Sequence, residues 1–354
     1  MINPYKGIDW GAIKQVYSST HDHIDEDTTQ SFRNEKLFSI HNFGNEQNRH
    51  INISNYVPSR PMHPLTSWFT QIPEGMIGTP GAEHTNISGA GHTVAIGSTF
   101  DSGEHASNVP NRVWTNFYQL IINDLVSPEM GGIYHAHVKR DGPGFNVLCE
   151  MLDTFDEFLG IAAYNGKDVK QGNDGWALDL WDEILSTGRR CWGFWEADAS
   201  NPWNHGYNIP NATYDPVGTG RNIVLVSDIN EENIMLSYRK GAFFGNRLAS
   251  GLSFESIQEN EGTIYVETNT ETNIVFVSTD LYGNVNVQTT DNVTNSSIEL
   301  NPNSTVYARI EAHLPDESDS VFSQPLIYMD KDAKQSFFRR RRLITTIRNN
   351  LFFE

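Results

Sequence analysis

The chain has 354 residues, of which 38% are hydrophobic and 11% aromatic, which is enough apolar surface for a folded core and excludes a wholly disordered chain. The formal net charge of −19 argues against the body of the protein binding a nucleic-acid backbone, because phosphate contacts need Lys and Arg side chains.

The first part of the chain, residues 1–248, alternates between strand and helix patterns. Short apolar runs predict buried strands at residues 133–134, 159–164, 191–195 and 222–226. Helical spacing of apolar side chains predicts helices over residues 113–126 and 176–186. A third helix is expected from a cap at Ser227 or Asp228 to about Lys240, where Gly241 ends it. This alternation predicts an α/β domain with a parallel sheet or a barrel.

The pattern changes over residues 249–330, where turn residues separate short alternating segments. These segments predict strands at residues 263–267, 273–277, 284–287 and 306–310, and we expect a small antiparallel β-sandwich domain. The last segment, residues 331–354, places Arg339 to Arg342 between two pairs of Phe. It is either a C-terminal helix or tail, or a peptide that docks on a protein partner.

Histidine and acidic residues recur where the predicted strands of the first part begin or end. His21 and His23 follow an apolar strand, and side chains two residues apart on an extended strand point the same way. Similar positions are held by His41, Glu83, His92, the pair His135 and His137, and Asp198. Histidine, aspartate and glutamate side chains are common ligands of divalent metal ions in proteins. Their repetition in chain order favours a metal centre, or the remnant of one, over isolated structural histidines.

The order of these motifs resembles the PHP (polymerase and histidinol phosphatase) superfamily of metal-dependent phosphoesterases. The shared order is H-x-H, a single H, G-x-E, G-H, A-H and D-A, and the segments 159–166, 177–190, 222–241 and 323–328 are also similar to family segments. The resemblance covers about residues 8–330. It implies a distorted (β/α)7 barrel in front of the β-sandwich, two or three Mn, Zn or Fe ions, and hydrolysis of a phosphate mono- or diester by metal-activated water.

Carried onto this chain, the resemblance implies a set of metal ligands. They are His21, His23, His41, Glu83 as the bridging carboxylate, His92, His137 and Asp198, with Asp27 or Asp25 as a further acidic ligand. The residues implied in catalysis are His21, His23, Glu83, His137 and Asp198. Lys139 and Arg140 follow His137 and are expected to contact the phosphate oxygens of the substrate.

Three positions depart from the family pattern. Ser200 stands where the closing motif has a histidine, Ile40 where an aspartate precedes the single histidine, and Ala162 where a glutamate is usual. The loss of a ligand weakens the hold on one ion without removing the whole site. His135 and His205 are candidates to replace the missing ligand.

Several functions are therefore compatible with the sequence. The first is a phosphoesterase acting on a phosphorylated small molecule or polymer. The second is a catalytically degenerate scaffold that serves as a structural or binding component of a larger assembly, such as a virion. The third places recognition of a glycan or a protein in the β-domain. A nucleotide triphosphatase and a serine hydrolase are disfavoured, because neither a Walker loop nor a G-x-S-x-G motif is present.

The sequence also bears on the expected location. No run approaches the roughly 20 apolar residues that a membrane-spanning helix needs, and the N-terminal residues do not read as a secretory signal. Cys149 and Cys191 are too few for a disulfide framework. We expect a cytoplasmic protein, or a virion protein if it belongs to such an assembly.

Overall fold

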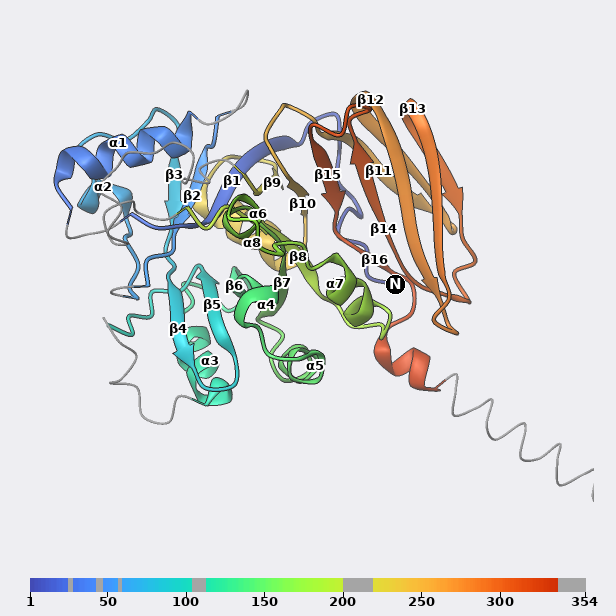
Figure 1. Ribbon diagram of the computed structural model, residues 1–354, viewed down its shortest axis with the longest axis horizontal. Helices are drawn as coiled ribbons and strands as arrows, with labels where there is room; N and C mark the ends of the chain where they lie inside the picture. Colours follow the sequence, from blue (N-terminus) through green and yellow to red (C-terminus); the bar gives the residue numbers. More distant parts are fainter. Residues whose placement is uncertain (25–27, 43–46, 57–58, 104–112, 200–218, 337–354) are drawn as a thin grey trace, which may run out of the picture.

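The computed structural model describes residues 1–24, 28–42, 47–56, 59–103, 113–199 and 219–336. Within these residues the strands form two sheets, one of eleven strands and one of five (Figure 1).

The larger sheet contains strands from both ends of the chain. They are β1 (Lys14–Asp22), β2 (His50–Ile53), β3 (Ile77–Thr79), β9 (Arg221–Val226), β10 (Phe243–Asn246), β11 (Phe254–Asn260), β12 (Thr263–Asp280), β13 (Val285–Glu299), β14 (Thr305–His313), β15 (Ser320–Ser323) and β16 (Leu326–Ile327). Their order is β11-β12-β14-β15-β10-β9-β1-β2-β3, with β13 paired to β12 and β16 paired to β14. β1 is parallel to β2 and antiparallel to β9, so the sheet is mixed.

The smaller sheet carries several of the histidine and acidic residues predicted as metal ligands. Its strands, in sheet order, are β4 (Glu83–Ile87), β5 (Gly91–Ile96), β6 (Gly132–His135), β7 (Phe158–Asn165) and β8 (Trp192–Glu196). β6, β7 and β8 are parallel, whereas β5 runs antiparallel to β6. The C-terminal ends of β6, β7 and β8 therefore lie at the same edge of the sheet as the first residues of β5.

Helices fill the space beside the two sheets. They are α1 (Gln30–His41), α2 (Leu65–Trp68), α3 (Trp114–Asn123), α4 (Val138–Asp141), α5 (Phe145–Thr154), α6 (Gly166–Lys170), α7 (Leu178–Leu185) and α8 (Glu231–Lys240). α3, α5 and α7 bury their apolar faces in one core with the smaller sheet. α8 packs on the larger sheet, where Ile234 and Tyr238 join the core around Val224 and Phe243. None of the described helices is long and apolar enough to cross a membrane.

The predicted (β/α)7 barrel followed by a separate β-sandwich is wrong. Both sheets are open over the described residues, since the end strands of each sheet order pair with no strand that would close it. β10 pairs with β9 on one side and β15 on the other, which joins strands expected in the barrel and in the sandwich into one sheet. The sequence pattern locates strands but does not specify their partners, and the antiparallel pairing of β9 and β10 replaces the parallel pairing that a barrel requires.

Some of the predicted helices and strands are confirmed, and others differ in type, extent or capping residue. The helices expected around residues 113–126 and 176–186 are confirmed as α3 and α7. Residues 37–40, the apolar run before His41 that the sequence pattern predicts as a strand, form the end of α1. The strands predicted at 263–267 and 273–277 are parts of the single strand β12. α8 is capped by the side chain of Asn230 rather than by Ser227 or Asp228, and it ends as expected at Gly241, whose φ is 74°.

Close packing where the two sheets meet gives a first testable prediction. A Cβ atom added to Gly245 in β10 would lie 2.1 Å from ring atoms of Trp195 in β8. We expect Gly245→Ala to lower the free energy of unfolding by about 1–3 kcal/mol, the usual cost of overpacking a core. Gly11→Ala is the control, because its Cβ would lie 3.5 Å from its nearest neighbour, Asp9. Urea unfolding of both variants measures the difference, and equal stabilities would show that the junction is loosely packed.

Candidate metal centre

The polar cluster lies where the C-terminal end of β1 meets the smaller sheet. Asp22 forms a bridge with Ala199, which follows β8, and the His23 N–H donates to the Ala199 carbonyl oxygen at 2.9 Å. The two histidines at the end of β1 therefore face the edge at which β6, β7 and β8 end. The sequence pattern does not predict this contact between the two sheets. The contact brings the polar residues at the ends of several strands close together.

Glu83, the first residue of β4, lies between two pairs of histidines. Its Oε2 atom is 3.3 Å from His21 Nε2 and 3.4 Å from His23 Nε2. Its Oε1 atom is 2.9 Å from His92 Nδ1 and 2.9 Å from His137 Nε2. Each carboxylate oxygen thus faces its own pair of imidazole nitrogens.

A second carboxylate completes each pair. Asp198 Oδ1 lies 3.2 Å from His23 Nε2 and 3.8 Å from His21 Nε2. On the other side of Glu83, Asp141 at the end of α4 lies 3.7 Å from His92 Nδ1 and 2.9 Å from His137 Nδ1, the ring nitrogen opposite the one that faces Glu83. The ligand atoms within each of three groups lie within 4.8 Å of one another, and the groups are His21, His23 and Asp198; His21, Glu83 and His137; His92, His137 and Asp141.

Burial in this cluster is unequal, which defines an inner part and an open side. The side chains of His21, Glu83, His137 and Asp198 are at most 2% exposed. On the outer side, the exposed fractions are 29% for His92, 31% for Asp141 and 36% for Arg140. Among the described residues, the cluster is therefore most accessible on the side of these three residues.

The pKa values reflect the concentration of carboxylates. Burial lowers the pKa of a histidine, yet the pKa of His21 is well above its ordinary value because nearby carboxylates, foremost Glu196, outweigh burial. Burial opposes protonation of His137 too, but hydrogen bonds to two carboxylates, Glu83 among them, raise its pKa to about 9. Burial would raise the pKa values of Glu83 and Asp198, but the positive histidines, first of all His21, hold both well below the ordinary range. The carboxylates of the cluster therefore favour positive charge close to them, either on His21 and His137 or on a bound cation.

The residues present fit a divalent metal ion. Imidazole nitrogens and carboxylate oxygens are the donors that such ions prefer in proteins. Among the described residues, His21 Nε2 and His23 Nδ1 are buried atoms without a hydrogen-bond partner. An unpartnered buried nitrogen is costly unless something binds it. The His21 Nε2 atom faces two carboxylate oxygens, so a cation is the species that suits this position.

A further buried carboxylate, that of Glu196, contacts both His21 and His137. It ends β8 and is fully buried. Its Oε2 atom accepts a hydrogen bond from His21 Nδ1 at 2.7 Å and one from the Tyr134 hydroxyl at 3.2 Å. Its Oε1 atom accepts bonds from the His137 N–H at 3.0 Å and the Asn165 amide at 2.9 Å.

Two cationic side chains converge on Asp198. Lys167 at the start of α6 places its Nζ atom 3.0 Å from Asp198 Oδ1. Arg140 in α4 places one guanidinium nitrogen 3.4 Å from Asp198 Oδ2 and 3.2 Å from Asp168 Oδ1. These cations come from different elements, and Arg140 lies on the outer side of the cluster.

The structure brings six of the predicted site residues together and places others elsewhere. The six are His21, His23, Glu83, His92, His137 and Asp198. His41 lies at the end of α1 with its Nδ1 atom 2.6 Å from the Asn48 carbonyl oxygen, and it belongs to none of the three groups. Asp25, Asp27, Ser200, His205 and the Arg339–Arg342 segment lie outside the described residues.

His135, a candidate substitute ligand, does not share the direction of His137. Its two ring nitrogens face the carbonyl oxygens of Ala136 and Ala90. The alternation of side chains on an extended strand does not apply here, because β6 ends at His135 and His137 has φ 20° and ψ 69°. The i, i+2 pair expected from the sequence is therefore split between the core and the cluster.

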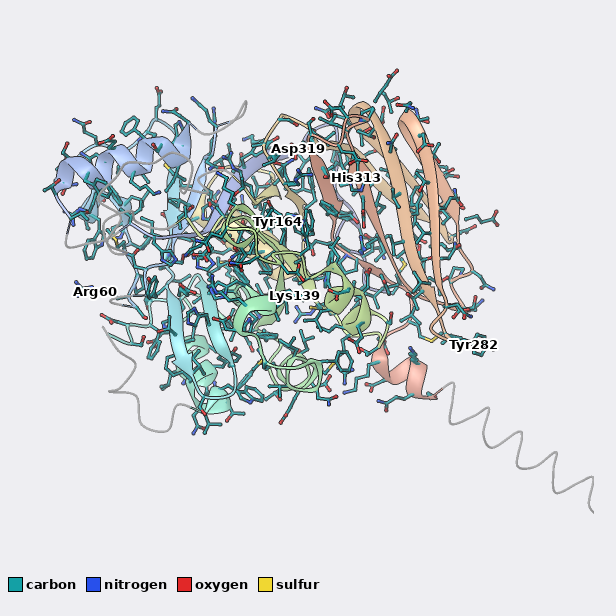
Figure 2. The ribbon with its side chains drawn as sticks, viewed as in Figure 1. Arg60, Lys139, Tyr164, Tyr282, His313 and Asp319 are labelled. Atoms are coloured by element: carbon teal, nitrogen blue, oxygen red, sulfur yellow. The ribbon has the colours of Figure 1, made fainter. Side chains whose placement is uncertain are left out.

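Lys139, predicted with Arg140 to contact phosphate, points away from the cluster. Its Nζ atom lies 2.7 Å from Asp179 in α7 and 3.8 Å from Asp174. In Figure 2 Lys139 is labelled between α4 and α7. Of the two predicted phosphate contacts, only Arg140 lies beside the cluster.

Some residues of the cluster were missed by sequence reasoning. Glu196 lies two residues before Asp198, so the i, i+2 rule that singled out His21 and His23 could have found it. Asp141 lies four residues after His137, the spacing of one helical turn. Lys167 follows the strand end Asn165, and no spacing rule marks it.

No family model, no curated protein and no solved structure matches this chain. The resemblance of the motifs to the PHP superfamily remains a prediction.

Proposed function

We propose that this protein is a metal-dependent hydrolase of phosphate esters that holds two divalent ions, one on each side of Glu83. The observation that carries the proposal is the arrangement of two histidine pairs on the two oxygens of this carboxylate. Two ions that share a bridging carboxylate are a recurring arrangement in phosphatases and nucleases. The order of the motifs in the sequence supports the same reaction class.

The two proposed positions have different ligands. His21, His23 and Asp198 would hold one ion, and His92, His137 and Asp141 would hold the other, with one Glu83 oxygen facing each. Histidine-rich sites with carboxylates suit Zn, Mn and Fe better than Mg or Ca, which prefer oxygen ligands. We therefore expect a metal of the first kind.

The charge on the open side supports an anionic substrate. Arg140 and Lys167 lie next to Asp198, where their N–H groups can donate to the non-bridging oxygens of a phosphoryl group. A bound ion on Asp198 would neutralise the carboxylate that these cations contact. Both side chains would then be available to the substrate.

The protein's own residues divide the work of the reaction. Divalent ions, when bound, supply an acidified water and polarise a phosphoryl oxygen. Arg140 and Lys167 bind and orient the phosphoryl group, and the buried inner histidines keep bulk water from one side of it. His92 and Asp141, which are partly exposed, lie on the outer side of the cluster.

The experiment that tests this function measures hydrolysis of an aryl phosphate monoester and the matching bis-aryl diester. The untagged protein is purified without chelator and assayed with added Mn or Zn, and again after exhaustive chelation and re-addition of metal. We expect turnover that disappears on chelation and returns with the metal. Metal binding without turnover of either ester would overturn the hydrolase and favour a scaffold that retains the metal centre.

A further inference from the structure

The side chain of Glu196 has a place in the cluster that the proposed metal ligands do not explain. It is fully buried, and an isolated buried carboxylate is costly unless hydrogen bonds compensate it. Four donors reach its two oxygens, and they come from β1, β6, β7 and the residues after β6. No proposed ion position includes it. A buried carboxylate with all of these hydrogen bonds fixes the positions of the groups that donate to it.

The contact with His21 is the most informative of the four. Glu196 accepts the His21 Nδ1–H at 2.7 Å, which leaves Nε2 as the atom that faces Glu83 and Asp198. Histidines that bind metals usually donate their other ring N–H to a carboxylate or a carbonyl, which fixes the ring orientation and the tautomer. His21 has this arrangement, because its Nδ1 is engaged and its Nε2 has no hydrogen-bond partner among the described residues.

The second oxygen of Glu196 extends the same effect to the other side of Glu83. It accepts the main-chain N–H of His137 at 3.0 Å. His137 has φ 20°, a backbone conformation that non-glycine residues rarely adopt. A hydrogen bond to a buried carboxylate helps to hold this conformation, and with it the Nε2 atom of His137 towards Glu83.

We propose that Glu196 is the positioning residue of the metal centre: it holds His21 and the His137 backbone so that the Nε2 atoms of both histidines meet at Glu83. This inference rests on the proposed metal centre and deepens it, because it names the residue that prepares the site before any ion arrives. Glu196 touches neither the ions nor the substrate.

The test uses the full-length protein and the affinity for Co²⁺, measured by competition with a chromophoric chelator, together with the visible spectrum of bound Co²⁺. Glu196→Gln keeps the size of the side chain and removes its charge, and Glu196→Ala removes the contact. We expect both to weaken Co²⁺ binding, by about 10- to 100-fold for the alanine variant, and to alter the spectrum. Tyr134→Phe is the control, because it removes a different hydrogen bond to the same carboxylate and leaves His21 in place.

A double-mutant cycle separates positioning from a general charge effect. If Glu196 acts through His21, Glu196→Gln should cost much less Co²⁺ affinity in a His21→Ala background than in the wild type. An equal cost in both backgrounds would overturn the action of Glu196 through His21 that the proposal requires.

Two further outcomes distinguish a failure of the positioning role from a failure of the proposed hydrolase function. Unchanged Co²⁺ affinity in both Glu196 variants would overturn the positioning role while leaving the metal-dependent hydrolase in place. A wild-type protein that binds no Co²⁺, Zn²⁺ or Mn²⁺ would overturn the proposed function, and the positioning role with it. Near-UV circular dichroism confirms folding, and the glutamine variant keeps the test valid if the alanine variant does not fold.

Discussion

Glu83→Gln is expected to abolish the binding of both proposed ions. The two oxygens of Glu83 face the two histidine pairs, and an amide offers one neutral oxygen and one N–H₂ group in their place. We expect metal affinity to fall by more than about 100-fold, beyond the range that is usual for residues outside the ligand set. Metal content after dialysis, measured by elemental analysis, gives the result.

The control for this substitution is Glu255→Gln, which makes the same chemical change at an exposed position of β11. It should retain the metal content of the wild type. A Glu83→Gln protein that is folded and still holds two ions would show that Glu83 does not bridge them. Hydrolysis should be lost together with the metal in Glu83→Gln, and its survival would point to a catalytic site elsewhere.

Lys167→Gln is expected to lower kcat/KM for a phosphate monoester by about 10- to 100-fold. A hydrogen bond from a charged group contributes about 1.5–3 kcal/mol, and each 1.36 kcal/mol is a factor of ten in rate. The inhibition constant of inorganic phosphate should rise in parallel. The metal content should not fall, because the Lys167 ammonium group competes with an ion for Asp198 Oδ1.

Lys139→Gln is the matched control for this prediction. Lys139 is also paired with an aspartate, but its partners are Asp179 and Asp174, away from the cluster. Its kcat/KM should stay near the wild-type value. If the two lysine variants lose activity equally, the effect is one of overall charge, and Lys167 does not contact the substrate.

The sequence predicts the elements of this fold better than their assembly. Apolar periodicity is a local property, and it located β7, β8, β9, α3, α7 and α8. Strand pairing depends on contacts between distant residues, such as Phe244 in β10 with Ser323 in β15. No local pattern specifies such a pair. Alternation predicted a parallel sheet or a barrel, and the resemblance to the PHP superfamily implied the barrel. The antiparallel strands that join the two ends of the chain were therefore missed.

The cluster was accessible to sequence reasoning to the extent that its residues lie beside strand termini. His21, His23, Glu83, His92, His137 and Asp198 all share that position, and the structure brings them together. His41 does not, because its supposed strand is a helix. Glu196 could have been found from its i, i+2 spacing to Asp198. Lys167 becomes visible only when its partner Asp198 is in place, because no sequence spacing links the two residues.

The measurement that tests the central claim most directly is the number of metal ions bound per chain. Wild-type protein, purified without chelator and dialysed against a mixture of Mn²⁺, Zn²⁺ and Fe²⁺ under reducing conditions, is analysed for each element. We expect two ions per chain, held by His21, His23 and Asp198 on one side of Glu83 and by His92, His137 and Asp141 on the other. A folded protein that binds no ion under these conditions would contradict the metal centre. His21 and His137, whose pKa values the neighbouring carboxylates raise, would then be protonated partners of these carboxylates rather than ligands.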